Sequence, residues 1–109
     1  MIVGFIKHSR EGIEKMKQII ELNFNLGNLD ELEGMNSELV AREVIDDLQK
    51  LYPNATINAN WNHNTIGACE TAEVVRTIGI ESDDATVQLA EILESIDVSD
   101  AKYYAGIRI

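Results

Sequence analysis

Residues 54–64 read Asn-Ala-Thr-Ile-Asn-Ala-Asn-Trp-Asn-His-Asn, and they show the clearest pattern in the chain. Every even position is polar, whereas the odd positions are mostly apolar. Because successive side chains of a strand point to opposite faces of its sheet, this alternation predicts one β-strand with a small apolar face and a face of amide side chains. We expect this strand to anchor a sheet.

Two other segments have the periodicity of an amphipathic helix. In residues 37–52, apolar side chains recur at three- and four-residue spacing, Ser37 is a candidate N-cap, and Pro53 is placed to end the helix. In residues 82–96, Ser82 precedes two aspartates that suit the positive end of a helix dipole. The sequence therefore predicts a helix over each segment.

The first 36 residues predict a strand, a helix and a loop. Residues 2–7 are mostly apolar and β-branched at three positions, which favours a buried strand. Positions 13, 16, 20 and 24 are apolar at helical spacing, Ser9 is a candidate cap, and Gly27 is placed to end the helix. Residues 28–36 are polar and acidic, which predicts a loop with one short helical turn at most.

Residues 71–80 fit two structures. As a strand, their even-numbered apolar side chains share one face, and the segment is rich in β-branched residues. As a helix, Ala68, Ala72 and Val75 line up. We favour the strand, which would form a hairpin with residues 56–64 through a long loop. Alternating apolar residues over 102–109 predict a further strand at the end of the sequence.

These elements predict a single α+β domain over residues 1–109, and an apolar content of 45% is ordinary for such a domain. The predicted order approximates the βαββαβ arrangement of a ferredoxin-like sheet, with its helices on one face. If residues 71–80 form a helix, the alternative is a three-stranded sheet with four helices.

The charge of the chain is strongly negative, at −10. Seven acidic residues fall in Asp30–Asp47, opposed only by Arg42, and nine fall in Glu70–Asp100, opposed only by Arg76. Direct binding to nucleic acid or to an anionic membrane is disfavoured, because both need a basic footprint. A basic protein partner is compatible with this distribution, since complementary fields speed encounter.

Other classes of protein and site have little support in the sequence. No apolar run approaches the roughly 20 residues that cross a bilayer, and the opening residues lack the charge order of a signal peptide, so we expect a cytoplasmic protein. Cys69 stands alone, and His8 and His63 match no metal-binding spacing. We therefore expect no metal and no cofactor, and we favour a protein without catalytic activity. Trp61 is expected in the core.

Our leading hypothesis is a small acidic protein that binds another macromolecule without catalysis. In its most concrete form, the protein inhibits or regulates a basic, nucleic-acid-processing protein. The two helices over residues 37–52 and 82–96 would face that partner. The expected contacts are Asp46, Asp47, Asp83 and Asp84.

A second hypothesis comes from the amide face of residues 54–64. Several asparagines on one face offer both donors and acceptors, so they could bind a small ligand, with or without catalysis, in a ferredoxin-like homodimer. The expected contacts are Asn58, Asn60, Asn62 and His63. A structural subunit of a larger assembly is the third hypothesis.

Overall fold

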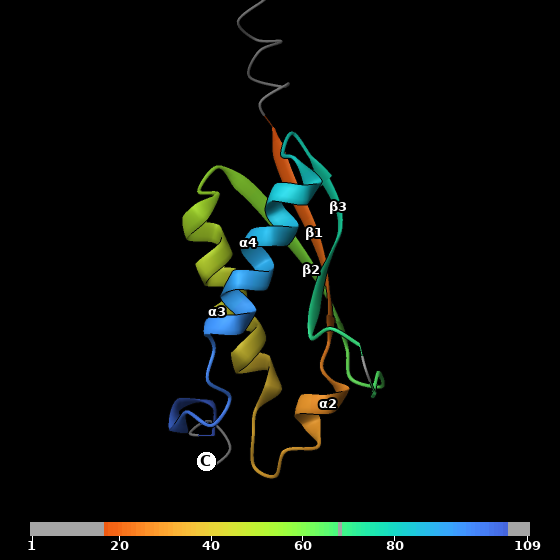
Figure 1. Cartoon of the computed structure of the whole chain (residues 1–109), viewed down its shortest axis with the longest axis vertical. Helices are drawn as coiled ribbons and strands as arrows, with labels where there is room; N and C mark the ends of the chain where they lie inside the picture. Colours follow the sequence, from red (N-terminus) through yellow and green to blue (C-terminus); the bar gives the residue numbers. More distant parts are fainter. Residues whose placement is uncertain (1–16, 68, 105–109) are drawn as a thin grey trace, which may run out of the picture.

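The computed structural model describes residues 17–67 and 69–104. Within them, three strands form one mixed sheet, accompanied by three α-helices and a 3₁₀ helix (Figure 1). The fold is therefore α+β, as the sequence predicts. The elements are β1 (Gln18–Asn25), α2 (Gly27–Asp30), α3 (Ser37–Leu51), β2 (Ala55–Asn62), β3 (Ala72–Ile78), α4 (Ser82–Ser95) and η1 (Ala101–Tyr103).

Strand β1 is the centre of the sheet, where it pairs in parallel with β2 and antiparallel with β3. Its even-numbered side chains, Ile20, Leu22 and Phe24, are at most 1% exposed. The predicted helix over this part of the chain is therefore wrong for residues 18–25. Positions 20 and 24 satisfy both a helical and a strand spacing, but Leu22 between them completes a two-residue alternation that a helix would not bury.

Strands β2 and β3 lie at opposite edges of the sheet, in the order β2-β1-β3. The predicted hairpin between them is therefore wrong, and the Asn-rich strand is an edge strand and does not anchor the sheet. The chain reaches β2 from β1 through α2 and α3, as a parallel pair requires. The predictions of a strand within residues 71–80 and of helices over residues 37–52 and 82–96 are confirmed.

Residues 63–71 carry the chain past the end of β1, from one edge of the sheet to the other. Asn25 holds the far part of this loop, because its backbone N–H donates to the carbonyl of Thr71 at 2.7 Å and its side-chain amide donates to that of Glu70 at 2.9 Å. Asn28 exchanges two hydrogen bonds with the backbone of Gly67. The loop is thus fixed to the segment that follows β1.

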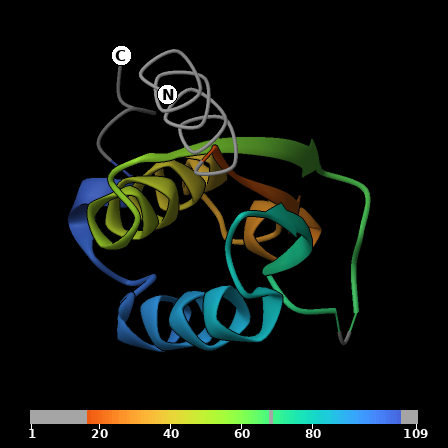
Figure 2. The same ribbon diagram turned by 90° about the horizontal axis from the view of Figure 1, so that it is seen from above.

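Helices α3 and α4 cover the face of the sheet that carries the buried side chains of β1 (Figure 2). The core fills this layer, and Trp61 lies at its edge. The Trp61 ring stacks on Phe24 with 5.2 Å between ring centroids, but 40% of the residue stays exposed because β2 is an edge strand. Neither α3 nor α4 covers the opposite, polar face.

The ends of the described chain test only part of the remaining predictions. Tyr103 lies in η1, so the predicted final strand is wrong at its start. Residues 105–109 and the predicted strand over residues 2–7 lie outside the described residues. The ferredoxin-like order is not established, and a three-stranded sheet fits the alternative, although residues 71–80 supply a strand to it.

The burial of β1 predicts that Leu22→Ala lowers the free energy of unfolding by about 2–5 kcal/mol, because it removes packed side-chain volume from the centre of the core. Urea unfolding would measure the change. Asn60→Ala, on the exposed face of β2, is the control and should shift stability by about 0.5 kcal/mol or less. Equal, small effects of both substitutions would contradict the central position of β1.

Candidate interaction surfaces

Helix α4 carries carboxylates without any basic side chain among them. Asp83, Asp84, Glu91 and Glu94 are all exposed, and residues 77–101 contain no lysine, arginine or histidine. The basic residues that flank this stretch both bond elsewhere. Arg76 Nη2 lies 2.8 Å from Glu21 Oε2 on the polar face of the sheet, and Lys102 Nζ lies 2.6 Å from Glu43 Oε1 on α3. Within residues 17–67 and 69–104, no ion pair joins a carboxylate of α4 to a basic side chain.

Asp84 also has a structural contact. The hydroxyl of Tyr52, just after α3, donates to Asp84 Oδ2 in the first turn of α4. Burial of the phenol, together with this hydrogen bond to a carboxylate, raises the pKa of Tyr52 to about 12. Asp84 thus connects the end of α3 to the start of α4. Asp83 lies beside it and is exposed as well.

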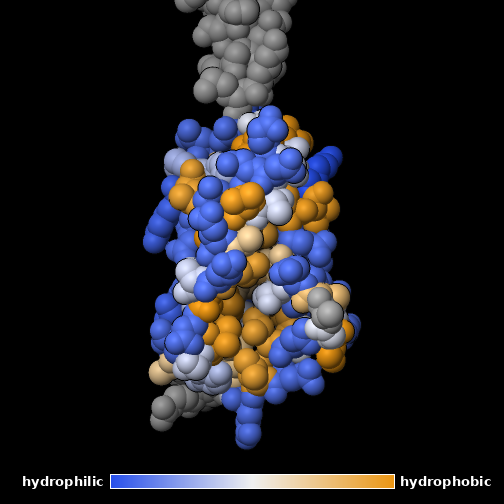
Figure 3. All heavy atoms as spheres, viewed as in Figure 1, coloured by the Kyte–Doolittle hydropathy of each residue, from blue (hydrophilic) through white to orange (hydrophobic). Residues whose placement is uncertain are grey.

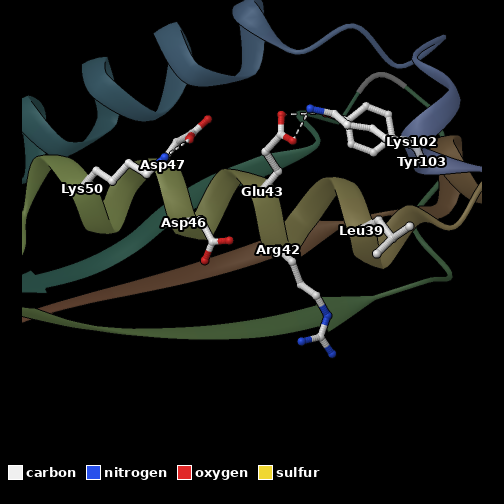
Figure 4. A pocket seen from close by; sticks show the side chains of 8 residues that line it. All are labelled: Leu39, Arg42, Glu43, Asp46, Asp47, Lys50, Lys102 and Tyr103. Carbon is white, nitrogen blue, oxygen red and sulfur yellow. Dashed lines mark hydrogen bonds and ion pairs between the residues drawn. The ribbon is translucent and has the colours of Figure 1, made fainter. Parts of the chain in front are cut away.

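Asp46 and Asp47 line a hollow of about 560 Å³ along α3 (Figure 4). Adjacent helix positions point in different directions, and the two side chains diverge in this view. Lys50 Nζ lies 3.8 Å from Asp47 Oδ1. The lining contains three acidic and three basic residues, so the charge of this hollow is balanced: Leu39, Arg42, Glu43, Asp46, Asp47, Lys50, Lys102 and Tyr103.

Glu43 is the polar centre of that hollow. Its carboxylate accepts hydrogen bonds from Lys102 Nζ at 2.6 Å and from the hydroxyl of the buried Tyr103 at 2.7 Å. Both bonds favour the ionised form, the one from Lys102 most strongly, so they hold the pKa of Glu43 below its ordinary value. The pair attaches η1 to α3.

A second hollow, of about 250 Å³, lies between β3 and α4. Apolar side chains gather in the space-filling view over the lower part of this side of the molecule (Figure 3). Of the described residues that line the hollow, two are acidic and none is basic. They are Glu70, Ala72, Glu73 and Val74 from the β3 side, and Thr86, Leu89, Ala90 and Leu93 from α4.

The asparagines of β2 form the predicted amide face. Asn58, Asn60 and Asn62 are exposed, and the register places them beside Glu21, Asn23 and Asn25 of β1. Amide and carboxylate side chains therefore run across two strands on the face that neither α3 nor α4 covers. Of the four contacts predicted for a small ligand, these three asparagines lie together on one face.

His63 turns away from these asparagines. Its Nδ1 lies 2.7 Å from Asp30 Oδ2, and its Nε2 lies 3.7 Å from Glu38 Oε2. Asp30 also accepts a hydrogen bond from the buried hydroxyl of Ser37, so the carboxylate stands between the hydroxyl and the imidazole. The cluster connects α2, α3 and the end of β2. In a catalytic triad the imidazole bonds directly to the nucleophilic hydroxyl, whereas here the carboxylate of Asp30 lies between the imidazole of His63 and the hydroxyl of Ser37.

Over residues 17–67 and 69–104, no group of three or more histidine, cysteine, aspartate or glutamate side chains is arranged to hold a metal ion. Cys69 is exposed. In the same part of the chain, no helix combines the length and apolar composition needed to cross a bilayer.

Comparison with known protein families, with curated proteins and with solved structures finds no match. The candidate surfaces therefore depend on the geometry alone. Sequence reasoning found the acidic helices and the amide face, but it missed the hollow between β3 and α4, whose walls come from segments that only the fold brings together. It also missed the contacts of Arg76 and Lys102, since their partners lie 55 and 59 positions away in the sequence.

The lowered pKa of Glu43 predicts a pH-dependent contribution to stability. A carboxyl group whose pKa is lowered by folding stabilises the fold above its ordinary value of 4.5, and this contribution is lost as the pH falls through the lowered value. Glu43→Gln should be less stable than the wild type near neutral pH, and the difference should narrow below about pH 4 in urea unfolding. Glu33→Gln, at an exposed position, should show neither effect. A difference for Glu43→Gln that stays constant with pH would contradict this assignment.

Proposed function

We propose that the protein is a small acidic binding protein without catalytic activity, and that it inhibits or regulates a basic, nucleic-acid-processing protein. The observation that carries the proposal is the negative charge of α4, which no ion pair among the described residues neutralises. Its flanking bases Arg76 and Lys102 are bonded to carboxylates on other elements. Such a surface repels phosphates and attracts the basic groove in which another protein would hold them.

The four predicted contacts differ in what they can offer a partner. Asp83 is exposed at the start of α4, whereas Asp84 is already bonded to Tyr52, and Asp46 and Asp47 lie in a hollow that also holds three basic side chains. We therefore centre the partner-binding surface on α4. In this proposal, α3 contributes at the margin through Asp46 and Asp47.

The proposal predicts that removing charge from α4 weakens capture of the partner. Tagged protein would be exposed to a native extract, washed and eluted by a salt step, and the basic protein released would be identified by mass spectrometry and its affinity measured. Glu91→Gln/Glu94→Gln should weaken binding by about 10-fold at low salt, because rim charges act through long-range attraction. The difference should shrink as the salt concentration rises.

Glu31→Gln/Glu33→Gln provides a matched control, because it removes the same charge from exposed positions between α2 and α3. This control should bind like the wild type. If both double variants lost the same affinity, the attraction would be due to net charge and would not come from α4. Recovery of a neutral partner that withstands the salt step would overturn the proposal in favour of an assembly subunit.

The amide face supports a second candidate function, the binding of a small polar ligand in a dimeric domain. Asn58, Asn60 and Asn62 are exposed along one strand, next to the amide of Asn23 on β1. Amide side chains can both donate and accept, which suits sugars and nucleobase edges. His63 is less suited to this site, because two carboxylates already engage it.

This candidate predicts that a nucleotide, a sugar or a divalent metal ion raises the melting temperature in a thermal-shift screen, and that Asn60→Ala abolishes the rise. An increase of about 2 °C or more is expected when the ligand is present at several times its Kd, since ligand binding to the folded state alone stabilises that state. Thr56→Ala, near the other end of the same face, is the control and should retain the response. A screen without any shift would remove this candidate.

A further inference from the structure

We infer that the hollow between β3 and α4 is a peptide-binding groove, in which an extended basic segment of the partner adds as a strand to the free edge of β3. The inference rests on the proposed function, because it takes the basic partner from there and names the part of it that is recognised. It adds a site that the acidic surface alone does not define.

The free edge of β3 offers backbone hydrogen bonds beside the hollow. In an antiparallel pair, residues alternate between those whose backbone groups face the neighbouring strand and those whose groups point away. Asn25 N–H donates to the Thr71 carbonyl, and the register continues through Phe24 opposite Ala72 and Leu22 opposite Val74. The N–H and C=O groups of Ala72 and Val74 therefore point outward, where the described part of the chain provides no neighbouring strand.

The same two residues direct their side chains into the hollow, together with Leu89, Ala90 and Leu93 of α4. An added strand would place alternate side chains over this apolar surface while its backbone pairs with β3. Ala90 is an exposed alanine on the α4 wall, so there is room above it for an incoming side chain. Edge strand, helix and apolar lining thus meet in the arrangement that binds extended peptides.

The charge of the groove selects the occupant. Glu70 and Glu73 are exposed at its rim, and none of the described lining residues is basic. A segment that alternates apolar and basic residues would bury the former and pair the latter with these carboxylates. A second copy of this chain is a poorer occupant, because its own β3 would bring the same glutamates opposite one another.

A β-bulge limits where pairing can occur. The register between β1 and β3 shifts between Glu21 and Leu22, and Val75 is the extra residue on β3. A bulge bends an edge strand and ends regular pairing, which protects such edges from unrestricted association. The part of β3 before the bulge, with Ala72 and Val74, is the part that lines the groove. Pairing is thus confined to one short segment.

The probe for this inference is the peptide acetyl-(Lys-Val)₃-amide, with binding to the full-length protein measured by isothermal titration calorimetry. We expect Ala90→Phe, which fills the groove from an exposed position, to weaken binding by about 10-fold or more. Val87→Phe is the matched control, because Val87 is exposed on α4 but does not line the groove. It should bind within about twofold of the wild type.

A second peptide separates strand addition from charge attraction. The same sequence with N-methyl groups on its valine amides keeps every charge but cannot pair with β3, so it should bind about 10-fold more weakly or worse. Equal binding of both peptides would overturn the inference. So would a dimer seen by light scattering that Ala90→Phe dissociates, because a second copy would then occupy the groove.

The captured partner distinguishes this inference from the proposed function. If Ala90→Phe leaves capture of the partner unchanged while Glu91→Gln/Glu94→Gln weakens it, the groove is not its site and the acidic-surface proposal still holds. If neither variant affects capture, both fail. We expect Ala90→Phe and Glu91→Gln/Glu94→Gln each to weaken capture. The controls Val87→Phe and Glu31→Gln/Glu33→Gln should leave it unchanged.

Discussion

The described structure depends on the pairing of β1 with a strand on each of its sides. Within the described sheet, β2 and β3 each pair with β1 and not with one another, so the sheet exists only while this strand holds both. Its buried side chains Ile20, Leu22 and Phe24 form the row against which α3 and α4 pack. The backbone groups of a central strand form hydrogen bonds with a neighbouring strand on each side, and one face of β1 is buried in the core. Its conformation is therefore set by the tertiary structure more than by local propensity.

The position of β1 also determines what is left for binding. Because α3 and α4 both cover its apolar face, the amide face stays open in the described part of the fold, and the sheet has two unlike edges. On the β2 edge, Trp61 is half covered by its stack on Phe24. On the β3 edge, the backbone groups of Ala72 and Val74 point outward, the bulge at Val75 follows them, and α4 lies beside this segment. The two edges therefore differ in chemistry although they flank the same strand.

The sequence predicts well where one periodicity stands alone. The helix that begins near Ser37 and ends before Pro53 is found, as is the strand over residues 55–62, because in both a single spacing of apolar residues fits. β1 is the failure: Ile20 and Phe24, four residues apart, fit a helix as well as a strand. Strand order could not be predicted either, because it depends on a loop held at Asn25 and Asn28, and nothing local to β2 or β3 encodes those contacts.

Charge could be predicted only as a distribution along the chain, whereas the structure shows which charges are neutralised. A net charge far from zero favours solubility wherever the charges lie, so solubility alone does not require the bases to gather in particular places. Among the described bases, Arg42, Lys50 and Lys102 line the hollow beside α3, and Arg76 bonds to Glu21 on the polar face. The groove beside β3 receives none among its described lining residues, although Arg76 belongs to that same strand. The two hollows thus differ in charge although the chain as a whole is acidic, and this difference supports the proposal that the groove beside β3 receives a basic partner.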